Sequence, residues 1–294
     1  NLIAHKKGSG SRVMFAAHMD EVGLIITGAD ADGSLRFATV GGIDRRVLCG
    51  KPVTVGKGVP GVIGAKPIHL LTSEEREKSV PVKDLYIDIG ALSRQEAEEA
   101  VSPGDPVTFD SLFDTAHGMI KSRALDDRAG CAILIDLLKK PLPYDMLFAF
   151  VVQEETGLNG SKTAAYIADP DAAIVVESTT AADVAGVPED KQVCHVGSGP
   201  VLSFMDRRTI YDRAYYQMAF DAAKETGVSC QAKQAVAGGN DAGAIHVSRG
   251  GVRTVAVSLP CRYLHSAVSL ISQKDFHEAE TLIERLAEKI AGGE

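Results

Sequence analysis

The stretch Ser122–Lys140, SRALDDRAGCAILIDLLKK, places two adjacent aspartates, Asp126 and Asp127, directly before an apolar run. Apolar side chains recur every three or four residues along that run, which predicts a helix packed on a core and ended by the Lys-Lys-Pro that follows. Taken alone, the two aspartates fit a helix cap and a first-turn carboxylate near the positive end of the helix dipole. Acidic side chains elsewhere in the chain favour a second interpretation, in which Asp126 belongs to a reactive site.

The composition is typical of a globular protein with a full hydrophobic core. The 294 residues are 45% hydrophobic and 24% charged, which is enough for one large domain and a smaller unit. Because the net charge is -8 and no cluster of Lys and Arg offsets it, nucleic acid and anionic membranes are not expected as partners. No apolar run approaches the roughly 20 residues of a spanning helix, and residues 1–10 lack the apolar core of a secretion signal. The default expectation is a cytoplasmic protein.

The cysteines are odd in number, widely spread and without a CxxC pair. This pattern predicts reduced packing residues rather than a disulfide framework or a thiolate zinc site. The five are Cys49, Cys131, Cys194, Cys230 and Cys261. The chain also begins on Asn1, at what resembles the end of a turn entering a strand, so we expect a segment upstream of it.

Strands and helices alternate in most of the chain, which predicts an α/β fold with a mostly parallel sheet covered by helices. The expected strands are 13–17, 146–152, 172–176, 201–205, 230–235 and 252–258, and the expected helices include 129–138, 157–167, 209–225, 241–247 and 273–290.

Residues 35–110 have a different texture. Short β-branched runs alternate there with Gly, Pro and charged turns, and only 93–101 has a helical pattern, which predicts a small all-β unit inserted into the main domain. The charged residues 74–78 are expected to form a solvated loop. Hinges at 41–42 and 115–118 would divide the chain into a main domain, residues 1–41 and 116–294, and an inserted unit, residues 42–115.

Polar side chains follow several predicted strands. Ligands of open α/β sheets bind beyond the carboxyl ends of the strands, so these side chains are expected to meet Asp126 in one crevice. Singly, each fits a loop charge, a helix cap or a core histidine. Together, unneutralised carboxylates would repel one another by several kcal/mol at reduced dielectric, and cations would remove the conflict. The residues are His18, Asp20, Glu154, Glu155, Glu177 and His265.

The residue types indicate which cations fit. Two histidines and several carboxylates without thiolates suit zinc, cobalt or manganese in a two-metal site, with the central Asp126 as the natural bridge. His18 and Asp20 lie two residues apart in an extended segment and therefore point to the same face. Asp20 can thus hold one ring nitrogen of His18 while the other binds a metal.

Six segments, taken together and in order, point to a known family: AHMDEVGLI (17–25), SRALDDRAG (122–130), VVQEETGLNGS (151–161), VVESTTAADVAG (175–186), GGNDAGAIH (238–246) and PCRYLHS (260–266). They resemble the tetrahedral aminopeptidase and glutamyl aminopeptidase family of dinuclear metallopeptidases. The resemblance covers nearly the whole chain. It implies a phosphorylase/hydrolase-like catalytic domain interrupted by a β-barrel dimerisation domain.

The resemblance also assigns roles. It makes Asp126 the bridging ligand, Glu155 and His265 the other ligands of one metal, and His18 and Glu177 those of the second. Asp20 would orient His18, and Glu154 would be the general base for a water activated by two metals. The implied protein is a metal-dependent aminopeptidase that acts on peptides, with two divalent ions per chain, zinc favoured over cobalt or manganese.

Assembly from dimers into dodecamers is implied for the intact protein, and two departures from the family bear on these expectations. Glu177 stands where some members have Asp, and one more methylene could shift the second metal. The few dozen residues that members carry before the start of this sequence are absent, which puts assembly of this chain in doubt.

Three other functions remain open. The first is a two-metal deacylase or carboxypeptidase-type amidohydrolase. The second is an endoglucanase with paired acids, although a chain with no Trp and 5% aromatic residues is poorly suited to a sugar-stacking cleft. The third is a non-catalytic protein with a degenerate site. The preferred N-terminal residue, acidic, leucine-like or basic, is also open, because Arg262 could face an acidic substrate or form a structural stack.

Overall fold

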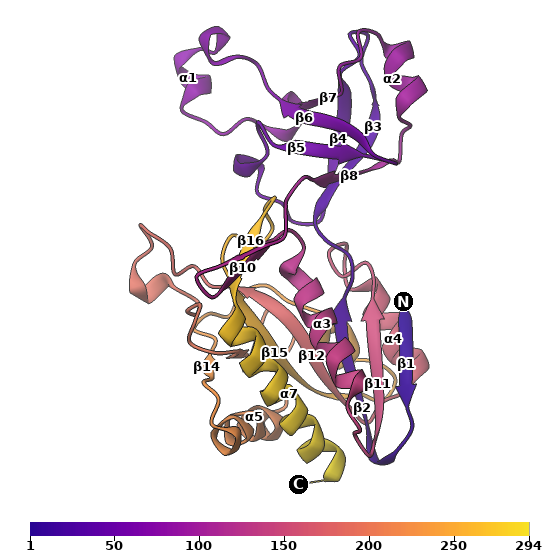
Figure 1. Ribbon diagram of the computed structural model, residues 1–294, viewed down its shortest axis with the longest axis vertical. Coiled ribbons are helices and arrows are strands. Elements are labelled where there is room, and N and C mark those ends of the chain that lie inside the picture. Colours follow the sequence, from indigo (N-terminus) through magenta and orange to yellow (C-terminus); the bar gives the residue numbers. More distant parts are fainter. Residues whose placement is uncertain (294) are drawn as a thin grey trace. The chain divides into compact units, whose positions relative to one another are not determined.

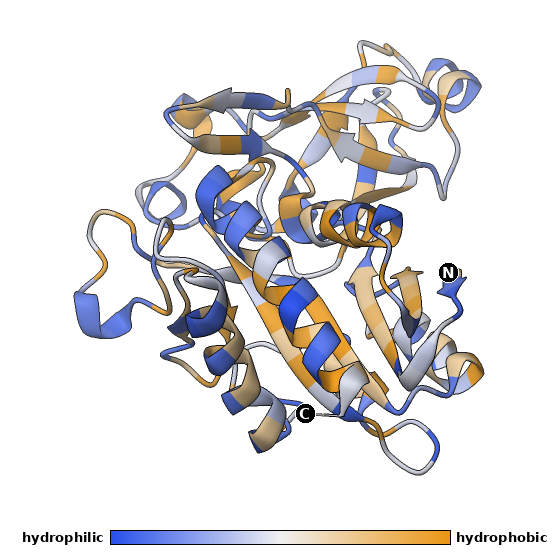
Figure 2. Cartoon of the chain, turned by 60° about the horizontal axis from the view of Figure 1, so that its bottom comes forward, coloured by the Kyte–Doolittle hydropathy of each residue, from blue (hydrophilic) through white to orange (hydrophobic). Residues whose placement is uncertain are grey.

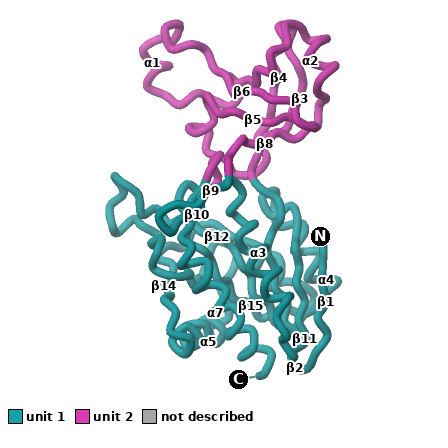
Figure 3. The backbone as a smooth tube through the Cα atoms, viewed as in Figure 1, with its two compact units in different colours: residues 1–21, 113–264, 269–294 teal, residues 22–112, 265–268 magenta. Residues whose placement is uncertain are grey.

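The computed structural model describes residues 1–293 and divides into two compact units, which Figure 1 and Figure 3 show as ribbon and tube. Unit 1 comprises residues 1–21, 113–264 and the chain from 269 onward. Unit 2 comprises residues 22–112 and 265–268. The second unit is therefore an insertion, completed by a short segment from near the C-terminus.

Unit 1 is built on a seven-stranded sheet with the order β1-β11-β2-β12-β15-β13-β14. Strands β11, β2, β12 and β15 are parallel, whereas β1 pairs antiparallel with β11, and β13 pairs antiparallel with β15 and parallel with β14. The predicted mostly parallel sheet is confirmed. The bounds are β1 Leu2–Lys6, β2 Ser9–His18, β11 Tyr144–Val151, β12 Ala172–Thr180, β13 Val201–Leu202, β14 Gln231–Ala232 and β15 Arg253–Cys261.

Helices cover both faces of this sheet. Alternate residues of β2 enter different cores, with Val13 and Phe15 on one face and Met14 and Ala16 on the other. The first face packs against α3 (Leu125–Lys139), α5 (Arg213–Thr226) and α7 (Gln273–Gly292), and the second against α4 (Asn159–Ala168) and α6 (Ala242–Ile245). Because both faces are buried, the strands are continuous apolar runs, and Figure 2 shows hydrophobic colouring concentrated in them.

A small second sheet in unit 1 leads into two of these helices. Its order is β16-β10-β9, with β9 Asp114–Ala116, β10 Met119–Ser122 and β16 Ser269–Ser272. Strand β10 precedes α3 and β16 runs directly into α7. One 3-10 turn, η4, lies at Glu189–Lys191.

Unit 2 is a closed six-stranded barrel with the order β3-β4-β7-β6-β5-β8. Its core includes the fully buried Leu35, Ile63 and Ile87. The strands are β3 Gly23–Ala29, β4 Leu35–Val40, β5 Pro52–Val55, β6 Val59–Gly64, β7 Tyr86–Asp88 and β8 Pro106–Phe109. The helices and 3-10 turns are α1 Ser73–Arg76, α2 Arg94–Ala100, η1 Arg45–Val47, η2 Ile68–Leu70 and η3 Val82–Asp84.

Two local expectations differ from the structure. The predicted boundary at residue 42 assigned β3 and β4 to the catalytic domain, although the predicted all-β texture already began at residue 35. In the structure β3 pairs with β4 and β8 and so belongs to the barrel. The charged residues 74–78, expected as a loop, include most of the one-turn helix α1, which Thr72 and Glu75 start with reciprocal capping hydrogen bonds.

Among the described helices, none is both long and apolar enough to cross a membrane.

Candidate metal centre

His18 is the last residue of β2, and its ring is buried in unit 1 with 1% of its surface exposed. Its Nδ1 lies 3.0 Å from the main-chain oxygen of Asp20 and 3.6 Å from the Asp20 Oδ1. Its Nε2 lies 3.4 Å from the Asp126 Oδ1 and 3.4 Å from the Glu177 Oε1. One ring nitrogen thus faces Asp20, whose main-chain oxygen is nearer than its carboxylate, and the other faces two carboxylates.

The two aspartates at the start of α3 have different surroundings. Both have non-helical backbone angles, and the chain enters them through Ala124 in the left-handed region with φ 54°. Asp127 is fully buried and accepts hydrogen bonds from the main-chain N of His18 at 3.3 Å and of Gly130 at 3.1 Å. Asp126 instead points toward His18. The capping interpretation therefore fits Asp127, and the reactive-site interpretation fits Asp126.

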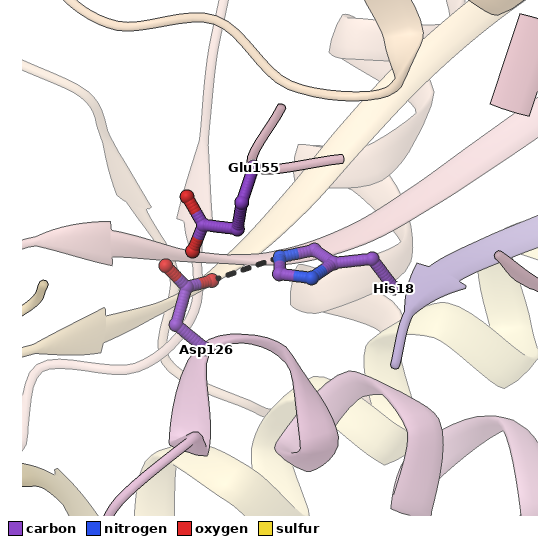
Figure 4. Close-up of side chains that lie close together, drawn as sticks. All are labelled: His18, Asp126 and Glu155. Carbon is purple, nitrogen blue, oxygen red and sulfur yellow. Dashed lines mark ion pairs between the residues drawn. The ribbon is translucent and has the colours of Figure 1, made fainter. Parts of the chain in front are cut away.

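Glu154 and Glu155 follow the end of β11, and Asp20 holds the backbone of both. The Asp20 Oδ1 accepts from the Glu154 N at 3.2 Å, and its Oδ2 accepts from the Glu155 N at 3.2 Å. Figure 4 shows the side chains of His18, Asp126 and Glu155 turned toward one another, with the His18–Asp126 ion pair drawn. Asp20 therefore links the histidine of β2 to the two glutamates that follow β11.

Two overlapping groups of side chains could each hold a cation. His18, Asp126 and Glu155 each offer one ligand atom within 4.8 Å of the others, and so do Asp126, Asp127 and Glu177. Asp126 is common to both groups, although they place His18 with Glu155, whereas the predicted ligand set placed it with Glu177. Imidazole nitrogen and carboxylate oxygen suit zinc, cobalt or manganese. Asp127 is an addition to the predicted set, which the sequence interpretation had treated as a helix-start residue.

The electrostatics of the cluster are those of acids that lack a counter-ion. Burial raises the pKa of Glu177 well above its usual range, and the charges of Asp126 and Asp127 raise it further, although His18 opposes them. Burial alone would lower the pKa of His18, but the charge of Glu177 and the nearby carboxylates of Asp126 and Asp20 raise it well above normal. Burial likewise raises the pKa of Glu154 to about 8. Bound cations would relieve this repulsion.

His265 belongs to unit 2, whereas the other predicted ligands belong to unit 1. Its Nδ1 is 2.9 Å from the main-chain oxygen of Gly42, and its φ is 57°. Its role as a metal ligand stays a prediction.

Asp241, at the start of α6, is a buried acid that the sequence analysis did not select. It is fully buried, and neither carboxylate oxygen has a hydrogen-bond partner among the described residues. Burial raises the pKa of Asp241 to about 6, although the nearby Ser161 side chain lowers this pKa in part. Its charge also raises the pKa of Glu154. The signal was present in the GGNDAGAIH segment, but a lone Asp before a short helix resembles a cap.

Arg262 is held by an acid of the protein itself. Its Nε donates to the Asp183 Oδ1 at 2.8 Å and its Nη2 to the Oδ2 at 2.7 Å. Arg262 is therefore paired within the chain, with Asp183 rather than an aromatic ring as its partner.

The chain matches a known protein family over most of its length. Residues 1–282 match the family described as M42 glutamyl aminopeptidase. The chain belongs to this family. Its M42 relatives include the glutamyl aminopeptidase of Lactococcus lactis, which is 33% identical over 95% of this chain and 81% of its own length.

Solved structures described as TET peptidases are similar to the chain. The TET aminopeptidase of a marine sediment thaumarchaeon has a TM-score of 0.93 and 37% identity, covering 97% of this chain and 83% of its own. A TET peptidase of Pyrococcus horikoshii, described as able to assemble into a tetrahedron or a large octahedral shell, has a TM-score of 0.85 and 38% identity, covering 97% and 86%. The predicted family and fold class are confirmed.

Proposed function

We propose that this chain is a metal-dependent aminopeptidase that binds two divalent ions and uses Glu154 as its general base. The ligands would be His18, Asp126, Glu155, Glu177 and His265. The observation that carries the proposal is the position of the His18 Nε2, buried 3.4 Å from both Asp126 and Glu177 and without a hydrogen-bond partner among the described residues. A buried ring nitrogen facing two acids is suited to share a cation with them.

The residues of the chain divide the reaction. Bound divalent ions supply a Lewis acid that polarises the peptide carbonyl and lowers the pKa of water. The Glu154 carboxylate takes the proton from the attacking water and delivers it to the leaving amine. Asp20 holds the main chain of Glu154 in place. The Glu154 carboxylate would therefore stay beside the cluster without binding a metal itself.

Restriction to the N-terminal residue would follow from charge. The free amine of a peptide is a cation near neutral pH, and the buried acids around His18 favour it over a blocked terminus. An N-acetylated peptide lacks that cation and would be a poor substrate. This separates an aminopeptidase from a deacylase or carboxypeptidase with the same metals.

Further proposals concern metal, partners and location. Zinc is the first candidate for the ion, with cobalt and manganese next. Self-association into dimers and larger shells is supported by the relatives, and light scattering after size exclusion tests it. Its five cysteines are all free thiols in the structure, which supports a reducing compartment such as the cytoplasm.

The test is hydrolysis of aminoacyl-p-nitroanilides, free and N-acetylated, by metal-stripped protein with zinc, cobalt or manganese added back. We expect activity only with added metal and a free amine. Glu154→Gln should lose at least about a hundredfold in kcat, the usual contribution of a general base. Glu189→Gln, an exposed glutamate in η4, is the matched control and should retain activity.

Metal content should be measured alongside by mass spectrometry. Two ions per chain and no turnover of any substrate would contradict the aminopeptidase proposal while leaving the metal site standing. Turnover that persists after metal removal and chelation would contradict the metal mechanism. It would favour the alternative of an endoglucanase-type pair of acids.

A further inference from the structure

A groove of about 790 Å³ lies in unit 1 between α4 and α6. Its walls include Gly157 and Leu158 on one side and Gly243 on the other. Gly157 comes two residues after Glu155, and Gly243 comes two residues after Asp241. One end of the groove therefore adjoins, along the chain, the segments that carry the acidic cluster. Its volume is that of a typical site for a small ligand or short peptide.

The charge of the groove is opposite to that of the whole protein. The net charge of the chain is -8, yet the groove is lined by Lys162, Arg208 and Arg249 and by no acidic residue. Arg249 is paired with Asp169 at 3.2 Å. Lys162 and Arg208 are exposed, and their charged groups have no ion pair or hydrogen bond with any residue that the structure describes. Two positively charged side chains are therefore available to bind a ligand.

The position of Arg208 is fixed by the chain around it. A Cβ at Gly239 would lie 3.2 Å from the Arg208 Cδ, and one at Gly243 would lie 2.8 Å from the Arg208 Cβ. The stem of Arg208 therefore rests on two glycines of the GGNDAG segment, while the main-chain N of Arg208 donates to Asp206 at 2.7 Å. These contacts hold the stem against the loop that carries Asp241.

A further polar group in the groove lacks a partner. Ser248 lines the groove, and its hydroxyl oxygen, which is shielded from the surface, has no hydrogen-bond partner among the described residues. Beside it, Tyr166, Ile167 and Val247 are more than half exposed and give the groove an apolar wall. The groove thus offers apolar contact and positive charge together.

We propose that this groove binds the acidic downstream part of peptide substrates, the residues that follow the one being removed. This rests on the proposed aminopeptidase function. Only the first residue and its amine belong at the acidic cluster, so the rest of the peptide must continue along the surface. A peptide with an ammonium at its start and carboxylates a few residues later matches the two opposite charges of acidic cluster and groove.

The test compares two amidated hexapeptides, Leu-Ala-Ala-Glu-Asp-Glu and Leu-Ala-Ala-Gln-Asn-Gln, which differ only in downstream charge. On metal-loaded protein, kcat/KM should favour the acidic peptide by roughly fivefold, the order that two exposed ion pairs supply, and added NaCl should reduce the ratio. Lys162→Gln and Arg208→Gln should bring the ratio toward one. Lys224→Gln and Arg213→Gln, exposed residues of α5, are the matched controls and should leave it unchanged.

A second measurement separates the groove from catalysis. The same two peptides, N-acetylated and labelled with fluorescein at the C-terminus, are titrated into metal-stripped protein and followed by anisotropy. Binding of the acidic peptide only, weakened in Lys162→Gln and Arg208→Gln, would support the groove even if no peptide is hydrolysed and the proposed function fails. Equal cleavage of both peptides, or a charge preference that persists in both groove variants, would overturn the proposal while the aminopeptidase stands.

Discussion

Asp20 uses three of its atoms to join two strand ends. Its main-chain oxygen faces the His18 Nδ1 at 3.0 Å, and its two carboxylate oxygens each accept a main-chain N–H, from Glu154 and from Glu155. Burial would raise the pKa of Asp20, but its contacts with His18 and these two N–H groups lower it, so it stays ionised. A single residue therefore contacts two proposed ligands, His18 and Glu155, and the proposed base, Glu154.

Replacing Asp20 with Asn should reduce activity without unfolding the protein. The amide keeps one acceptor oxygen but turns an NH₂ toward one of the two main-chain N–H groups, so either Glu154 or Glu155 loses its hydrogen bond. We expect kcat/KM or metal affinity to fall about 10- to 100-fold, as is usual for residues that orient metal ligands. Zinc titration and kinetics measure the two effects separately. Asp190→Asn, exposed in η4, is the control, and equal activity in both variants would contradict the orienting role.

At the scale of elements, the site depends on how closely α4 packs on the end of β11. Gly160, in the first turn of α4, is buried, and a Cβ there would overlap the main-chain oxygen of Val152 and lie 2.7 Å from its N. Val152 follows β11 and precedes the pair Glu154 and Glu155. The absence of a side chain at Gly160 thus lets helix and strand end approach, and this approach fixes the path of the chain through the two glutamates.

Gly160→Ala should therefore damage both stability and function. Backbone cannot move aside as a flexible side chain can, so α4 or the segment after β11 must shift, at a cost of about 1–3 kcal/mol in the free energy of unfolding. Urea denaturation measures this cost, and p-nitroanilide hydrolysis should fall along with it. Gly250→Ala is the matched control, because a Cβ there meets nothing within 4 Å. If Gly160→Ala were as stable and active as Gly250→Ala, the close approach would not control the site.

At the scale of the whole molecule, the sequence predicted the buried strands and helices. It missed which strands pair with each other and which way individual side chains point. Apolar runs such as Met146–Val151 could be assigned to the sheet because both faces of those strands are buried. The run after Glu21 is equally apolar, but hydrophobicity does not say which strand it pairs with, so β3 and β4 were given to the wrong domain. The predicted ligands followed from strand ends. The different orientations of Asp126 and Asp127 depend on backbone angles that no sequence pattern showed.

The acidic cluster should couple the stability of the whole molecule to pH and to metal. The pKa of Glu154 is raised to about 8 in the folded chain, mainly by burial, against its ordinary value of 4.5, and the pKa of Glu177 and of His18 is raised as well. At a pH between the ordinary pKa of Glu154 and its raised pKa, this side chain keeps its proton in the folded state and releases it in the unfolded state. Stability of the metal-free protein should therefore be greatest below about pH 4.5, as far as these groups decide it, and fall as the pH rises toward 8.

Divalent ions should reverse this trend, because they bind the deprotonated ligands and so bind more tightly at higher pH. The measurement is the thermal midpoint at pH 5.5 and pH 8.5, with and without zinc. We expect the metal-free midpoint to drop between the two pH values and zinc to raise it more at pH 8.5. In Glu154→Gln the metal-free drop should be smaller, because one of the titrating acids is gone. A metal-free midpoint that rises over this range, or a zinc effect larger at pH 5.5, would mean that the acids of the cluster are not held protonated by burial, and the electrostatic argument for metals at this site would fail.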